Sequence, residues 1–218
     1  MPSGQPVDTN YYLDLDNNVP VWYDEDNKTI YYYLPESKKL ALNPDSSYMF
    51  EGFNRLQSID VSQFITESVE IMDFMFANCE TLTYLDTGRF FTQNVRSMNS
   101  MFMNCKSITK LPVDGFDTEK VLDMSYMFAG CESLNFLDIR NFDMHHAPAI
   151  YGMFNNCSNL EYIYVRHNTD WNKYFQDRNI ELFLGCYKLP NYSDNKTTIE
   201  YAHTCYYDYT DGYFTEME

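Results

Sequence analysis

One group of residues has side-chain types that could bind a metal ion. His145 and His146 are adjacent, and with Asp143 or Cys157 they could supply nitrogen, oxygen and sulfur ligands. The spacing fits no zinc-binding pattern, however, and Cys157 belongs to a repeated apolar column. We therefore expect histidines in a surface loop and no metal site.

A second group has the types needed for nucleophilic catalysis. His203 and Cys205 could act as base and nucleophile, but no third group in the sequence is placed to orient the base. No glycine-rich phosphate-binding loop is present either. We therefore predict that the protein is not an enzyme and uses no cofactor.

The other cysteines follow a fixed repeat. A disulfide framework would place cysteines in pairs, and neighbouring turns of a solenoid lie too far apart for a bridge that needs Cα atoms about 4.4–6.8 Å apart. We therefore predict small, buried, apolar thiols. Five of the six cysteines form this column: Cys79, Cys105, Cys131, Cys157 and Cys186.

The step of that column is the step of the whole chain. Apolar residues recur every 26 residues, and the last copy follows after 29, as the phenylalanines show: Phe50, Phe76, Phe102, Phe128, Phe154 and Phe183. A period of 26 lies within the range of leucine-rich repeats, about 20–29 residues. Stacking such units buries apolar faces that one unit alone leaves exposed.

One unit predicts a helix followed by a strand. Thr118 is a suitable N-cap, and Met124, Phe128 and Cys131 recur at steps that line one helical face. Leu137 and Ile139 then have strand spacing. The expected fold is an α/β leucine-rich-repeat solenoid with one short helix and one short parallel strand per 26-residue turn.

The array is expected to have a cap at each end. Residues 1–47 predict a leader and a β-hairpin cap over 19–33, residues 48–189 about five to six repeats, and residues 190–218 an acidic, tyrosine-rich cap with a strand around 199–203. In the fourth repeat, we expect the helix to begin near Pro148, because proline is tolerated at a first helical position.

Charge narrows the classes of partner. The formal net charge is −17, which disfavours nucleic acids and anionic membrane surfaces. No apolar run approaches the roughly 20 residues that span a bilayer, and the first residues have no signal-peptide pattern. We expect no membrane insertion, and either a cytosolic protein or a fragment of a longer secreted chain.

The best copy of the repeat, Val121 to Asp138, resembles the 26-residue repeat of bacterial surface proteins of the BspA-like leucine-rich type. The segment Gly212 to Thr215 and the tyrosine-rich hairpin look like segments that flank such arrays. The resemblance implies a bacterial protein at the cell surface or secreted, a role in adhesion or protein binding, and no catalytic residues.

The strand residues that point away from the core form the predicted binding surface. Leu137 and Ile139 point inward, so their neighbours should lie on a concave face, in a strip of five strands. Aromatic residues and arginine are enriched at binding hot spots, which favours a protein partner of a monomer; a glycan-binding module and a structural spacer are the alternatives. The predicted partner-binding residues are Tyr84, Asp86, Lys110, Asp114, Phe136, Asp138, Arg140, Tyr162, Tyr164 and Arg166.

Overall fold

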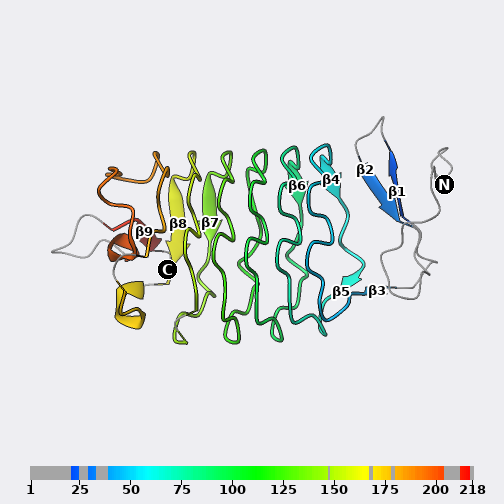
Figure 1. Ribbon diagram of the computed structural model, residues 1–218, viewed down its shortest axis with the longest axis horizontal. Helices are drawn as coiled ribbons and strands as arrows, with labels where there is room; N and C mark the ends of the chain where they lie inside the picture. Colours follow the sequence, from blue (N-terminus) through cyan, green and yellow to red (C-terminus); the bar gives the residue numbers. More distant parts are fainter. Residues whose placement is uncertain are drawn as a thin grey trace.

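The computed structural model describes residues 21–24, 29–32, 39–146, 148–166, 169–177, 180–203 and 212–216. Within them the chain winds into coils that lie side by side in a row (Figure 1). The elements are β1 (Val21–Asp24), β2 (Thr29–Tyr32), β3 (Leu40–Ala41), β4 (Ser58–Ile59), β5 (Phe64–Ile65), β6 (Tyr84–Leu85), β7 (Phe136–Asp138), β8 (Tyr162–Val165), the 3₁₀ helices η1 (Trp171–Tyr174) and η2 (Ile199–Tyr201), and β9 (Phe214–Glu216).

The strands form three sheets, in the orders β1-β2-β4-β6, β3-β5 and β7-β8-β9. Strands of neighbouring coils pair in parallel, and the paired residues are 26 apart, as for Ser58 with Tyr84 and Leu137 with Ile163. The predicted hairpin is present, because β1 and β2 pair antiparallel. Its second strand pairs with β4, so the hairpin covers the first coil.

The predicted helix of each repeat is wrong. Between Met124 and Cys131 the chain makes successive tight turns, and alternate N–H groups donate to carbonyl groups of the next coil, as Met124 does to Ala149 (2.7 Å) and Phe128 to Met153 (3.0 Å). An α-helix would bond these groups within the segment. Turns also return a side chain to the interior every three or four residues, which is why the apolar pattern resembles a helical one.

Two further helix predictions fail for related reasons. Thr118 is not an N-cap; its side chain is buried, and its hydroxyl accepts the N–H of Asp143 in the next coil at 2.6 Å. No helix begins at Pro148, since Ala149 forms a parallel bridge with Asp123. Both residues take part in contacts between coils instead.

Left-handed backbone at fixed positions makes these turns possible. Glycine and asparagine adopt positive φ at lower cost than other residues, and asparagine can satisfy nearby backbone groups with its side chain. One column contains only these two residues, with φ from 58° to 77°: Gly52, Asn78, Asn104, Gly130, Asn156 and Gly185. The repeat is therefore encoded by backbone requirements as well as by apolar side chains.

The core is a file of aromatic rings flanked by thiols. The rings of Phe102 and Phe128 lie 5.9 Å apart and within 9° of parallel, and the other neighbours in the column stack similarly. Beside them, Cys131 Sγ donates to the carbonyl of Phe102 at 3.2 Å, and burial raises the pKa of this thiol to about 12. The prediction of buried, unpaired cysteines is confirmed for the five in the column, whereas Cys205 lies outside the described residues.

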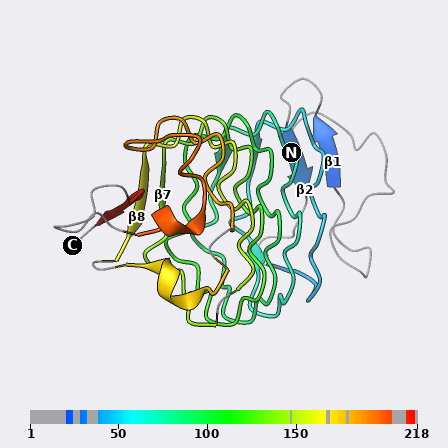
Figure 2. The same ribbon diagram turned by 60° about the vertical axis from the view of Figure 1, so that its left-hand side comes forward.

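The C-terminal end differs from the predicted cap. The strand expected around 199–203 is the helix η2, because Ile199 and Ala202 are both buried, and a three-residue step places them on one side of a 3₁₀ helix. The added strand is β9, which pairs in parallel with β8. The short helices η1 and η2 lie at this end of the stack (Figure 2).

Candidate binding surface on the strand side

The predicted partner-binding residues all lie at the surface. Leu137 and Ile163, which alternate with these residues along β7 and β8, point into the core, as strand alternation requires. Exposed residues are Tyr84, Asp86, Lys110, Asp114, Tyr162 and Arg166, and half-buried ones are Phe136, Asp138, Arg140 and Tyr164. The strands β4, β6, β7 and β8 lie in one row along the array (Figure 1).

The expected strip of five strands is interrupted at its third coil. Pro112 has no N–H to donate to a neighbouring strand, and the N–H of Val113 bonds locally to the Leu111 carbonyl at 3.1 Å. The Thr87 hydroxyl donates to the Pro112 carbonyl at 2.8 Å. As a result β6 ends one sheet and β7 begins another, so the strand side has two separate parts.

Three aromatic rings form the centre of the second part, and we call Phe136, Tyr162 and Tyr164 the aromatic cluster. Tyr162 and Tyr164 stack with centroids 6.0 Å apart, and Phe136 lies 6.1 Å from Tyr164 at a tilt of 57°. Phe136 and Tyr162 are direct partners in the β7–β8 register. The ammonium group of Lys110 lies 6.0 Å from the centre of the Phe136 ring, which joins a cation to the cluster.

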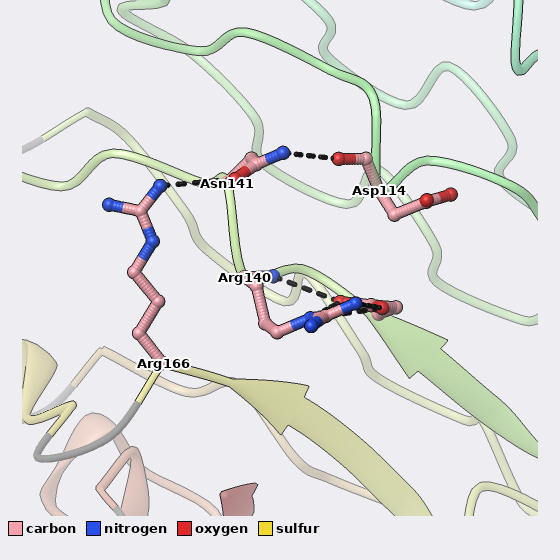
Figure 3. A network of polar contacts seen from close by, with 5 residues as sticks. Asp114, Arg140, Asn141 and Arg166 are labelled. Atoms are coloured by element: carbon pink, nitrogen blue, oxygen red, sulfur yellow. Dashed lines mark hydrogen bonds and ion pairs between the residues drawn. The ribbon is translucent and has the colours of Figure 1, made fainter. Parts of the chain in front are cut away.

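A polar network borders the cluster (Figure 3). Arg140 Nη2 and Nε bond to the Asp138 carboxylate at 2.7 and 2.9 Å, and this contact holds the pKa of Asp138 below its usual value. Asn141 joins three coils, since its amide donates to the carbonyl of Asp114 and accepts from Arg166 Nη2 at 3.0 Å. Figure 3 shows the guanidinium of Arg166 reaching across to Asn141.

Asp60 and Asp86, which directly follow β4 and β6, have a structural role that the sequence analysis missed. Asp60 Oδ1 accepts the N–H of Ser62 at 2.9 Å, and Asp86 Oδ1 accepts that of Gly88 at 3.0 Å. Such contacts terminate each strand with a turn. Both carboxylates are exposed on the strand side.

A groove of about 520 Å³ opens at the C-terminal side of the cluster, and the sequence analysis also missed it. Arg140 and Arg166 line one wall, and Lys173 and Tyr174 of η1 line another. η1 lies in the segment where the repeat step lengthens from 26 to 29 residues, and that change of step is the signal for an insertion beside the strands.

The histidine predicted to be in a surface loop lies in this groove. His145 is exposed; its Nδ1 contacts the Asp143 carboxylate, and its Nε2 lies 3.4 Å from the Tyr174 hydroxyl. Its neighbour His146 is also exposed. No group of three or more metal-binding side chains occurs within the ranges that the structure describes. The pairing of His203 with Cys205 stays untested, because Cys205 is outside those ranges.

A smaller hollow of about 330 Å³ lies in the first part of the strand side. Tyr84, Asp86 and Arg89 line it, together with residues of β4 and the turn that follows. The surface residues predicted from the sequence are therefore divided between two places. Tyr84 and Asp86 belong to this hollow, and the others lie at or beyond the Pro112 coil.

The fold and this surface define a class of protein: a coil-repeat solenoid with short parallel strands and an exposed strand side. The chain belongs to the family described as mycoplasma protein of unknown function, DUF285, whose model matches residues 44–167, more than half of the 218 residues. Among solved structures, a leucine-rich repeat protein of T. pallidum (TpLRR) is similar with a TM-score of 0.44 and 15% identity, over 83% of this chain and 92% of that one.

A comparison with curated proteins gives no significant match. As for membranes, the described part of the chain contains no helix with the length and apolar character needed to cross a bilayer.

Proposed function

We propose that this chain is a non-catalytic binding module of a bacterial surface or secreted protein, and that it recognises a protein partner through the strand side. The observation that supports this most directly is the aromatic cluster of Phe136, Tyr162 and Tyr164 with Lys110 beside it. Large aromatic side chains and arginine dominate the energetics of protein interfaces.

The cluster is not needed to complete the core. Leu137 and Ile163 occupy the inward positions of the same strands and are fully buried. Tyr162, in contrast, is 44% exposed although it is held against Tyr164. Rings fixed in this way lose little freedom when a partner covers them, which lowers the cost of binding.

A display selection tests the proposal. Peptides from a displayed random library would be selected on the intact chain and then measured on Phe136→Ala/Tyr162→Ala. We expect binding to fall at least about tenfold, since a hot-spot truncation costs about 2 kcal/mol or more. The control is Phe91→Ala/Tyr151→Ala, which removes an exposed phenylalanine and a tyrosine whose exposure is similar to that of Tyr162, both outside the cluster.

Circular dichroism and thermal unfolding of both double variants would check that each still folds. If the selected peptides bind the Phe136→Ala/Tyr162→Ala variant as tightly as the intact chain, the strand side is not the binding surface. Equal losses in the two double variants would have the same meaning, because they would show no preference for the cluster.

A further inference from the structure

The cations beside the aromatic cluster differ in how far their charges are compensated. Arg140 is paired with both oxygens of Asp138. Among the residues that the structure describes, Lys110 and Arg166 form no ion pair; Lys110 faces the Phe136 ring and Arg166 bonds to the neutral amide of Asn141. Two uncompensated positive charges thus flank three aromatic rings in a chain whose net charge is −17.

The same surface is unsuited to a densely charged polyanion. Asp114 lies in the repeat column of Arg140 and Arg166, and Asp138 lies on β7 directly opposite Tyr164. A sulfated glycan or a nucleic acid brings closely spaced negative charges that would meet these carboxylates. A ligand with few, separated negative charges meets the two cations without that repulsion.

The positions of the two cations set the spacing of the ligand's charges. Lys110 is aligned with Phe136 and Tyr162 in the repeat, and Arg166 follows Tyr162 by four residues, directly after the end of β8. Two coil steps of about 4.8 Å and four residues of about 3.3 Å give a separation of about 16 Å between the Cα atoms of Lys110 and Arg166. The aromatic cluster lies between them.

We infer that this surface binds an extended acidic peptide segment of the form acidic–x–apolar–x–acidic, a conclusion that rests on the proposed function. In an extended chain, alternate residues point to the same side, so the two carboxylates and the apolar residue face the protein together. Their Cα atoms span about 13 Å, and the lengths of the glutamate, lysine and arginine side chains cover the difference. The apolar side chain meets the aromatic cluster while the carboxylates meet Lys110 and Arg166.

The probe is a fluorescein-labelled peptide with the segment Glu-Thr-Leu-Thr-Glu between Gly-Ser flanks, and binding to the full chain is measured by fluorescence anisotropy. We expect saturable binding that weakens as salt rises, because the charges are at the surface. Lys110→Ala and Arg166→Ala should each weaken it about twofold to fivefold, the range of exposed ion pairs. Lys120→Ala and Arg96→Ala remove the same charges elsewhere and should leave binding unchanged.

Three other ligands decide whether the form is right. A peptide with glutamines in place of both glutamates, and one with the second glutamate moved by one residue, should bind at least about threefold more weakly. The third is a heparin hexasaccharide. Equal binding of either altered peptide would overturn the inference, as would tighter binding of the hexasaccharide through Lys110 and Arg166.

The two proposals fail in different ways. Absence of any binding of the Glu-Thr-Leu-Thr-Glu peptide at millimolar concentration would reject the acidic segment. The proposed function would still stand if peptides selected on the intact chain depend on Phe136 and Tyr162. Both proposals would be rejected if peptide binding depended on neither the aromatic cluster nor Lys110 and Arg166.

Discussion

The side chain of Thr92 replaces a strand backbone in the contact with the next coil. Its hydroxyl accepts the N–H of Asp117 at 2.7 Å and donates to the carbonyl of the same residue at 2.9 Å. Thr66 makes the same pair of contacts with Phe91. Thr66 and Thr92 therefore each satisfy two backbone groups of the neighbouring coil.

Replacing Thr92 by valine keeps the shape and removes both contacts. We expect the free energy of unfolding to fall by about 1–3 kcal/mol, because two partly buried backbone groups lose their partner. The control is Thr83→Val. The hydroxyl of Thr83 is exposed and donates to the Gln57 carbonyl at 3.1 Å, so water can take its place in the variant. Urea unfolding measures both, and equal effects would show that the Thr92 contacts have no special weight.

The glycines of the left-handed column allow strain to be separated from crowding. Gly52 has φ +76° and open space where an added methyl group would lie, so Gly52→Ala should cost only the left-handed penalty, about 1–2 kcal/mol. At Gly130, φ is +75°, and an added Cβ would collide with Asn104, whose Cα lies 3.3 Å away. Gly130→Ala should therefore lower the free energy of unfolding by about 1–3 kcal/mol more. Thermal unfolding of the two variants would contradict this if the losses were the same.

The thiol column predicts sensitivity to alkaline pH. The pKa of Cys131 is raised from its usual 9.0 to about 12 by burial, so the folded chain keeps a proton that the unfolded chain releases. Stability is thus fully present below pH 9 and is lost as pH rises toward 12, with a slope of about 1.4 kcal/mol per pH unit for one thiol. Cys131→Ala should flatten the stability-versus-pH curve by about that amount, measured by urea unfolding between about pH 8 and 11. An unchanged slope would mean that the thiol is not protonated in the folded state.

The Asp138–Arg140 pair predicts the opposite behaviour in acid. The hydrogen bond from Arg140 lowers the pKa of Asp138, so its contribution is present above the unfolded value of about 3.9 and is lost as pH falls through the folded pKa. Asp138→Asn should lower stability at neutral pH and converge with the intact chain below that range. Arg140→Gln should do the same, and the double variant should add little; additive losses would show that the two residues act separately.

The repeat could be predicted from the sequence, whereas the backbone conformation within each repeat could not. Columns such as Phe102 with Phe128 and Cys105 with Cys131 identify the inward residues, and the alternation around Leu137 identifies the outward ones. The choice between helix and turns depends on where the N–H of Met124 finds its acceptor, and that acceptor lies in the next coil. Spacing along one coil does not contain this information.

In the candidate site, too, features set by local spacing could be predicted and features set by contacts between coils could not. Lys110, Phe136, Tyr162 and Arg166 lie at the surface, as the local alternation along each coil predicts, and their role in binding stays a prediction. The break at Pro112 could be foreseen from its missing N–H, but the groove depends on how η1 packs beside Arg166. Contacts of that kind arise from tertiary packing, which the repeat pattern does not encode.

The hydrogen bonds between coils give the array a fixed spacing from one coil to the next. The turn segment beginning at Met124 passes its bonds to the following coil, as Tyr126 does to Tyr151 at 2.7 Å, so one coil can be added or removed without leaving its neighbours unpaired. Each addition would lengthen the array by about 4.8 Å. The coil of Pro112 separates the Tyr84 hollow from the aromatic cluster. The number of coils at this place therefore sets the distance between the two surfaces, and would set how far apart two ligands, or two parts of one ligand, bind.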